Sequence, residues 1–476
     1  MSFFDDSTLA FLPSGGAGKD GKAYSIKPTN GTGDFTFSRG SNLTATRINA
    51  SGLIEKGREN LFLNSDTPAT QSITITNGSV YVFSFLGTGS VVATGGASFT
   101  LNGTGALDRV QNFFVASSTS VTLTISGTIT EPQLELGTTA TSYIETDASS
   151  ALGGLLEDSP RFDYNGGASC PSLLIEHSRT NEIAYSEYFE GWTQQGSPTI
   201  TSNYGTSPEG LQNSSRLVFT NGSDYIETSV TNTSGVFSIY AKGTGNLILT
   251  DSGANASSTT ALTSSYQRIT LYFSTNTTTL QIKTDGSGLD AEVYGAQFEN
   301  ATYETSYIPN HSSGSATRNL ERSIGGTISN INEGVLFFEG SVLKNNDTIK
   351  LIEFNDGGLN NVIQLYYRDS SGTQPRVYAI AKSGGTQVYG YAYNIPSGRG
   401  EDTHKVAFRF EDNNFALFYN GTKVDSQTSG TISTNPKNQL MYETSVGVIP
   451  FRGNVKQTLV FGTALTDDDC ETLTTL

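Results

Sequence analysis

The sequence predicts an all-β chain made of multiple antiparallel β-sandwiches. Its 476 residues are 35% hydrophobic and only 15% charged, and 52 of them are glycine. Short strands joined by tight turns have this composition, whereas helix surfaces need Glu, Lys, Ala and Leu. The 26 Phe and 22 Tyr argue against a disordered chain, because disordered segments are poor in aromatic residues. We therefore expect helix in less than about a tenth of the chain.

Residues 1–56 are predicted to form two or three strands. Phe35 and Phe37 alternate with polar residues, and Asn30-Gly31 supplies a turn. The first residues lack the basic segment and the apolar core of a secretory signal. No run of about 18 apolar residues occurs in the sequence, so we expect no membrane insertion.

The middle of the chain contains an internal repeat. The segment Gln133–Glu145 (QLELGTTATSYIE) matches Gln297–Pro309 (QFENATYETSYIP) at seven of thirteen positions without a gap. We interpret residues 57–147 and 178–311 as two copies of one antiparallel module of jelly-roll type, the first copy being the shorter. Trp192, the only tryptophan, belongs to the second copy and is expected in its core.

A hinge segment, residues 148–177, separates the two copies. Within it, the apolar run Leu173–Ile175 follows Gly166-Gly167 and Pro171, which is typical of a buried strand. We expect this strand to pack and pair with strands from residues 1–56.

Residues 318–476 do not continue the repeat. Strand-like runs follow one another there, and the alternating run Phe415–Tyr419 is followed by Asn420-Gly421, the strongest hairpin signal in the chain. The segment Thr466–Leu473 (TDDDCETL) predicts a short helix, with a threonine cap and three aspartates in its first turn. This order resembles a concanavalin A-like or laminin-G-like sandwich.

The hinge phrase also carries a resemblance to a known group. Pro160–Trp192 contains RFDY, CPSLLIE, RTN and YSE, and it is similar to phrases in bacteriophage virion proteins, mainly tail-fibre, tail-tip and head-fibre proteins. In those proteins the phrase leads into a jelly roll similar to carbohydrate-binding modules. The resemblance implies a virion protein made in the host cytoplasm and released by lysis, with residues 1–56 nearest the particle. It also implies other virion proteins as partners and a homotrimeric assembly.

Composition and motif content argue against several other functions. The net charge of −17 counts against a nucleic-acid partner, because phosphate binding needs clustered Lys and Arg. The histidines and cysteines are scattered singly, so we expect no metal, no cofactor and no disulfide framework. The histidines are interpreted as surface or loop residues. These residues are His177, His311, His404, Cys170 and Cys470.

No recognised catalytic motif occurs, and we expect the chain not to be an enzyme. A pair of carboxylates on a sandwich could cleave polysaccharide, as in glycosidases. Glu299, Glu339, Glu353 and Asp356 are the candidates for such a pair. A polysaccharide-degrading fibre therefore stays an alternative.

A binding protein is the preferred interpretation. Sugars stack their C–H faces on aromatic rings and hydrogen-bond to polar side chains. Tyr389, Tyr391 and Tyr393 share one strand face, which either binds sugar or is covered by another sheet or subunit. The candidate ligand-binding residues are Tyr366, Tyr367, Arg368, Asp369, Arg376, Tyr389, Tyr391 and Tyr393.

We therefore expect a fibre or tail adhesin that binds a host cell-surface glycan through its C-terminal sandwich. The alternative is a capsid or tail decoration protein without a ligand.

Overall fold

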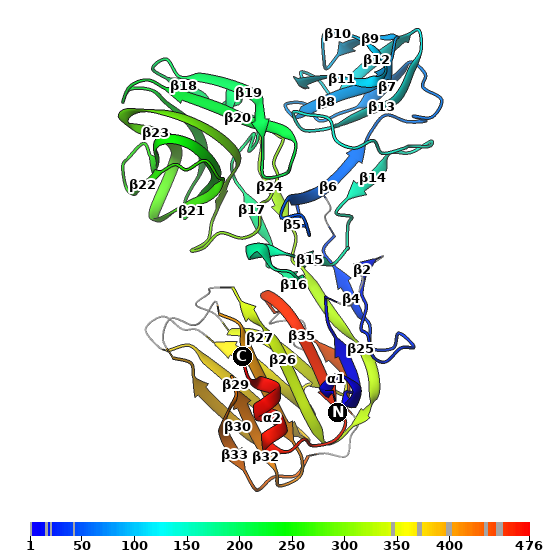
Figure 1. Ribbon diagram of the computed structural model, residues 1–476, viewed down its shortest axis with the longest axis vertical. Helices are drawn as coiled ribbons and strands as arrows, with labels where there is room; N and C mark the ends of the chain where they lie inside the picture. The colour runs from blue at the N-terminus through cyan, green and yellow to red at the C-terminus, as the bar shows by residue number, and fades with distance from the viewer. Residues whose placement is uncertain are drawn as a thin grey trace.

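The protein is an elongated assembly of antiparallel sandwiches, which confirms the predicted fold class (Figure 1). The computed structural model describes residues 2–14, 18–19, 21–40, 43–343, 348–368, 374–396, 402–432, 437–443 and 451–476. Helix in these ranges is confined to α1 (Phe3–Asp6), α2 (Asp467–Thr474) and the 3-10 turns η1 (Asn165–Gly167) and η2 (Phe189–Gly191). Within the described ranges, no helix has the length and apolar character needed to cross a membrane.

The C-terminal sandwich, at the bottom of Figure 1, consists of two sheets packed face to face. One sheet has the order β15 (Arg161–Asp163), β16 (Ser172–Ile175), β35 (Gly453–Phe461), β26 (Gly334–Val342), β31 (His404–Phe410), β32 (Phe415–Tyr419) and β33 (Thr422–Gln427), with β1 (Leu9–Phe11) also on β35. The other has the order β2 (Gly18–Lys19), β3 (Lys22–Ala23), β4 (Phe35–Ser38), β25 (Arg322–Ile331), β34 (Lys437–Met441), β27 (Thr348–Asn355), β28 (Val362–Arg368), β29 (Arg376–Ser383) and β30 (Thr386–Asn394).

The hinge strand belongs to this C-terminal sandwich. Strand β16 pairs with β15 on one side and with β35 on the other, where Leu173 faces Val455. Our expectation that it pairs with a strand of residues 1–56 is therefore wrong. Leu173 and Ile175 are nevertheless buried in one core with Leu9 and other apolar residues of residues 1–56, so the two segments pack together as expected, although β16 pairs with β35.

The N-terminal strands are also incorporated into the C-terminal sandwich. Strand β1 pairs with β35, with Leu9 opposite Val460, and β4 pairs with β25, with Phe37 opposite Ser323. The first and last parts of the chain thus share one core, although the first and second modules lie between them in the sequence.

The first module is a small sandwich at the upper right of Figure 1. Its sheets have the orders β10-β9-β12-β7 and β11-β8-β13. The strands are β7 (Gln71–Thr74), β8 (Val80–Gly87), β9 (Ser90–Gly95), β10 (Phe99–Asn102), β11 (Gly105–Val115), β12 (Ser120–Ser126) and β13 (Ile129–Leu136). Phe83 and Leu123, both fully buried, come from opposite sheets and belong to one core.

The second module, at the upper left of Figure 1, is built around two long bent strands. Its strands are β18 (Thr193–Gln195), β19 (Thr199–Thr206), β20 (Gln212–Phe219), β21 (Tyr225–Asp251), β22 (Ser257–Ala261) and β23 (Gln267–Glu299). Phe237 of β21 lies opposite both Leu271 and Phe298 of β23, so β23 passes β21 on both sides. Trp192 is 4% exposed and packs against Phe189 in this core, as expected.

Each module is entered and left by a short ladder of paired strands. In the first, β6 (Ile54–Asn60) pairs with β14 (Ala151–Gly154) and with β5 (Thr46–Ile48). In the second, β17 (Arg179–Asn181) pairs with β24 (Ala316–Arg318). In each module, the strand that enters and the strand that leaves therefore lie side by side and connect the module to the rest of the chain.

Two local predictions in the C-terminal sandwich are confirmed. Asn420 and Gly421 have φ values of 45° and 82° and connect β32 to β33, which is the backbone that an Asn-Gly hairpin turn needs. The Thr466 hydroxyl accepts a hydrogen bond from the Asp469 amide, and the Asp469 carboxylate accepts one from Thr466 in return. This capping box begins α2.

Candidate functional site

Four of the predicted tyrosines face the interior of the C-terminal sandwich. Tyr391 on β30 lies opposite Ala379, which is buried, so alternation places the other two tyrosines of this strand on the same inner face. Tyr367 and Tyr389 are 1% and 2% exposed, and Tyr391 and Tyr393 pack against the same core. The expectation that these four residues bind sugar is corrected: Tyr367 and Tyr389 are core residues, and Tyr391 and Tyr393 are partly buried against that core.

Tyr389 shows how completely this inner face is used. Its ring stacks at 5.1 Å from that of Phe408 and at 5.4 Å from that of Phe415. Its hydroxyl donates a hydrogen bond to the Asp425 carboxylate at 2.8 Å. Each part of this side chain therefore already has a partner within the protein.

Three of the other predicted residues lie on the outer face of the same sheet. Tyr366 of β28 lies directly opposite Tyr378 of β29, and the two half-buried rings stack with centroids 4.6 Å apart and planes within 5°. Two residues farther along β28, Arg368 lies opposite Arg376. Asp369, predicted with them, lies outside the described residues. We define Tyr366, Tyr378, Arg368 and Arg376 as the outer patch.

The outer patch combines aromatic surface with donor groups. Burial raises the pKa of Tyr366, and the neighbouring Tyr378 adds to this, so the phenol stays protonated at neutral pH. The Nε atom of Arg376 is shielded from water and has no hydrogen-bond partner in the structure. Tyr378 was not among the predicted residues, because its place opposite Tyr366 depends on the register of two strands separated by a loop.

The candidate catalytic carboxylates are spread over different elements. Glu299 ends β23 in the second module and accepts hydrogen bonds from Thr305. Glu339 lies on β26 in one sheet of the C-terminal sandwich, and Glu353 lies on β27 in the other sheet. Asp356 follows β27 and accepts a hydrogen bond from Asn361.

The histidines differ from the prediction in one case. His404 is 1% exposed on β31, and its Nδ1 lies 2.7 Å from the Tyr419 hydroxyl. The expectation of a surface or loop position is therefore wrong for His404, which packs under β30 beside the core tyrosines. Across the described ranges, no group of three or more His, Cys, Asp and Glu side chains is arranged to hold a metal ion.

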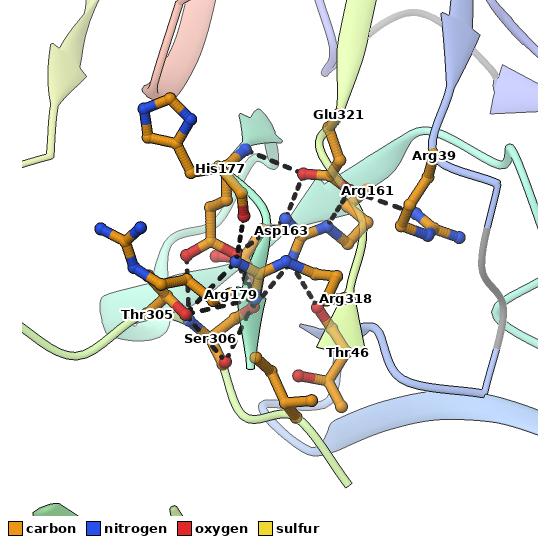
Figure 2. Close-up of polar contacts among 12 residues, drawn as sticks. Arg39, Thr46, Arg161, Asp163, His177, Arg179, Thr305, Ser306, Arg318 and Glu321 are labelled. Carbon is orange, nitrogen blue, oxygen red and sulfur yellow. Dashed lines mark hydrogen bonds and ion pairs between the residues drawn. The ribbon is translucent and has the colours of Figure 1, made fainter. Parts of the chain in front are cut away.

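A buried charge network lies where the modules meet the C-terminal sandwich (Figure 2). We call it the junction network, and each of its members is at most 3% exposed. It consists of Arg39, Arg161, Glu176, Arg318 and Glu321.

Arg161 of β15 is at the centre of the junction network (Figure 2). Its guanidinium forms a bidentate pair with Glu321 and donates to Glu176 at 2.8 Å and to the Ser306 hydroxyl at 2.7 Å. Arg318 lies 3.1 Å from the same Glu176 carboxylate. One side chain therefore connects the hinge segment, the second module and the strand that leads into the C-terminal sandwich.

The electrostatics of the network follow from burial and pairing. Burial alone would raise the pKa of Glu176, but Arg318 and Arg161 outweigh it and hold this pKa at about 2. Arg161 has a raised pKa, because Glu321 and Glu176 overcome the cost of its burial. Such networks hold elements in one arrangement, since losing any partner leaves a buried charge unpaired.

Comparisons with known proteins give only partial likenesses. No family model matches the chain, and no curated protein matches it. Among solved structures, the Ruminococcus gnavus IT-sialidase CBM40 is 19% identical with a TM-score of 0.26, and the match covers 30% of this chain and 84% of that one. Mouse laminin α1 domains LG4-5 are 9% identical with a TM-score of 0.21, covering 60% of this chain and 94% of that one. The Limulus polyphemus heptameric SAP-like pentraxin is 12% identical with a TM-score of 0.26, covering 31% and 72%.

Proposed function

We propose that the chain is a bacteriophage structural protein, a fibre or tail adhesin that binds a glycan on the host surface. The observation that supports glycan binding is the outer patch, where the stacked Tyr366 and Tyr378 adjoin Arg376. Half-exposed aromatic rings match the C–H faces of a sugar, and guanidinium groups donate to its oxygens. The virion assignment rests on the hinge phrase Pro160–Trp192 and its resemblance to fibre proteins.

The proposed assembly is a homotrimer in contact with other virion proteins. One outer patch per subunit would bind weakly, with a dissociation constant on the order of 1 mM, or about 4 kcal/mol. Several patches on one particle are linked, so that once one patch is bound the others meet the glycan at a high effective local concentration. This linkage converts weak sites into firm attachment.

The test uses point substitutions in the whole chain. Deleting residues 318–476 would remove β25 and β35, which pair with β4, β1 and β16, and would expose the core that they share. We therefore compare the wild type with Tyr378→Ala and Arg376→Gln for binding to bacterial polysaccharides immobilised on beads. Tyr272→Ala, which removes a 44% exposed tyrosine from the second module, is the matched control.

Tyr378→Ala is expected to weaken binding about tenfold, since it removes one stacked ring. Arg376→Gln should weaken it by a similar factor, while Tyr272→Ala binds as the wild type does. Equal binding by all four proteins would contradict the outer patch. If the wild type binds no polysaccharide and does not block adsorption of virus to cells, a decoration protein without a ligand replaces the adhesin.

A further inference from the structure

A cavity of about 310 Å³ lies between the first and the second module. The first module and its entry strand supply Arg58, Ile75, Tyr81 and Thr138 to its walls, while the second supplies Asn213. Its location differs from that of the outer patch, since none of its lining residues comes from the C-terminal sandwich. Cavities of this size at module boundaries are common ligand sites.

Three of the lining residues have buried polar atoms without any hydrogen-bond partner. They are Arg58 Nε, Thr138 Oγ1 and Asn213 Oδ1. Thr138 and Asn213 are each only 3% exposed. A buried polar group without a partner costs about 1–3 kcal/mol, so a molecule that pairs with these three atoms would recover that cost. The set contains one donor, one acceptor and one hydroxyl that can be either.

Both cations at the cavity are paired with carboxylates. Lys56 Nζ lies 3.0 Å from Glu187 and 3.0 Å from Glu209, and Arg58 lies 3.0 Å from the second oxygen of Glu209. Burial would raise the pKa of Glu209, but Lys56 and Arg58 hold it at about 2. Glu59 and Glu135 also line the cavity, so carboxylates outnumber cations there and an anionic ligand would be repelled.

Part of the remaining lining is apolar. Leu61, Ile75, Tyr81, Leu136 and Leu211 all contribute side chains to the walls. A ligand that fits needs hydroxyl groups that both donate and accept, one apolar face and no negative charge. A neutral sugar ring has these properties, and after small side-chain rotations its hydroxyls can reach the three unpartnered atoms.

At the corresponding position of the second module, a tyrosine side chain occupies the space. Aligning the repeat puts Thr139 opposite Tyr303 and Arg58 opposite Arg179. In the second module the Tyr303 ring centroid lies 5.4 Å from the Arg179 guanidinium, and the Tyr303 hydroxyl accepts a hydrogen bond from Arg179 at 3.3 Å. In the first module, Thr139 lines the cavity beside Arg58 and leaves the corresponding space open.

We propose that this inter-module cavity is a second binding site, which takes one neutral pyranose unit of a glycan. The site is independent of the outer patch. A sugar bound here would contact both modules and would fix them relative to each other.

The test is saturation-transfer NMR on the full chain with methyl α-glucopyranoside, methyl β-galactopyranoside, methyl α-mannopyranoside and N-acetylglucosamine. Two variants address the cavity. Thr139→Tyr places there the residue that the second module itself uses, and Thr138→Val removes a hydroxyl that has no partner in the protein. Ser215→Ala is the matched control, because it removes a buried, unpartnered hydroxyl that does not line the cavity.

At least one sugar should bind with a millimolar dissociation constant. Thr139→Tyr should abolish this binding, and Thr138→Val should weaken it about threefold to tenfold. Ser215→Ala and Tyr378→Ala should bind as the wild type does, and the latter separates this site from the outer patch. No signal from any of the four sugars would overturn the proposal and leave water as the occupant. Undiminished binding by Thr138→Val would overturn it as well, even if Thr139→Tyr does not fold.

Discussion

The two copies of the repeated module share one buried hydrogen-bond network, here called the polar closure, which joins the first strand of each copy to its end. The copies differ in the part of the molecule that packs against this network. Asn60 in the first copy and Asn181 in the second are both fully buried. The Asn60 amide donates to the carbonyls of Pro132 and Ile144, at 3.2 and 2.7 Å. The Asn181 amide donates to those of Ala296 and Ile308, at 3.1 and 2.9 Å.

The matched segments themselves form the rest of this closure. Gln133 donates to Glu135 at 2.6 Å, and Glu135 accepts from the backbone amide of Thr141 at 2.8 Å. In the second copy, Gln297 donates to Glu299 at 2.7 Å, and Glu299 accepts from the backbone amide of Thr305 at 2.8 Å. The identities that reveal the repeat are therefore residues that close the loop after the last strand, and they are structural.

The difference lies one residue beyond this closure. The Ser306 hydroxyl of the second copy accepts a hydrogen bond from Arg161 at 2.7 Å, and the Ser306 backbone amide donates one to Glu176 at 2.9 Å. The second copy is thereby joined to the junction network. The corresponding Ser142 of the first copy is exposed. The second copy is thus anchored to the C-terminal sandwich by buried charges, while the first copy meets the second across an open cavity.

Removing the centre of the junction network should give the largest effect. Arg161→Met leaves Glu176 and Glu321 buried without their shared partner, and we expect a loss of about 3–5 kcal/mol in the free energy of unfolding. Urea denaturation followed by fluorescence measures it. Arg216→Met removes an arginine from a solvent-exposed pair with Asp290 and should change the midpoint little. Similar midpoints for the two variants would contradict the anchoring role.

Removing the shared asparagine should have similar effects in the two copies. Asn60→Ala and Asn181→Ala each remove four hydrogen bonds to backbone groups, and we expect losses on the order of 3 kcal/mol for each. Differential scanning calorimetry gives the comparison, with Asn246→Ala at the surface as the control. A large loss for one copy alone would show that the closure is not equivalent in the two.

Much of this architecture could be predicted from the sequence, because it depends on local patterns. The hairpin at Asn420-Gly421, the capped α2 and the repeated module are each encoded within a few neighbouring residues. The pairing of β16 with β35 could not be predicted. The two strands lie far apart in the sequence, at Ser172–Ile175 and Gly453–Phe461, and any buried strand would satisfy the local pattern.

The candidate site shows the same limit. Alternation correctly put Tyr389, Tyr391 and Tyr393 on one face, but the sequence does not tell which face is covered. Tyr378 needed the register between β28 and β29, and the inter-module cavity needed the arrangement of two modules. One signal was available, because LIE at Leu53–Glu55 and at Leu174–Glu176 precedes both copies and shows that the repeat begins earlier than residue 57.

Acid should have a smaller effect on the free energy of unfolding, and its sign should differ between parts of the chain. The pKa values of Glu176 and Glu209 are held at about 2, below the ordinary value of 4.5. Their stabilisation is present above pH 4.5 and is lost as the pH falls towards 2. At pH 3.5 each should have lost about 1.5 kcal/mol.

Glu135 in the first copy behaves in the opposite sense. Burial raises its pKa, so protonation favours the folded state and its contribution to stability grows as the pH falls. Carbon-13 titration of the glutamate carboxyls measures all three groups. A Glu135 midpoint below those of Glu176 and Glu209 would contradict this electrostatic contrast.

The smallest expected effect comes from making the first copy resemble the second. Thr139→Tyr should raise the free energy of unfolding by about 1 kcal/mol, because the ring buries apolar surface in an existing cavity and lies beside Arg58. Thermal unfolding at neutral pH measures the change. A loss of stability would mean that the space opposite Tyr303 cannot hold a ring.

The proposed binding of glycan by the chain is tested most directly on a microarray of bacterial surface polysaccharides. The labelled full-length wild type should bind a subset of the printed glycans, and Tyr378→Ala should bind that subset about tenfold more weakly. Tyr272→Ala should give the wild-type pattern. Absence of binding by the wild type to every glycan, when the protein is presented in multivalent form, would contradict the account.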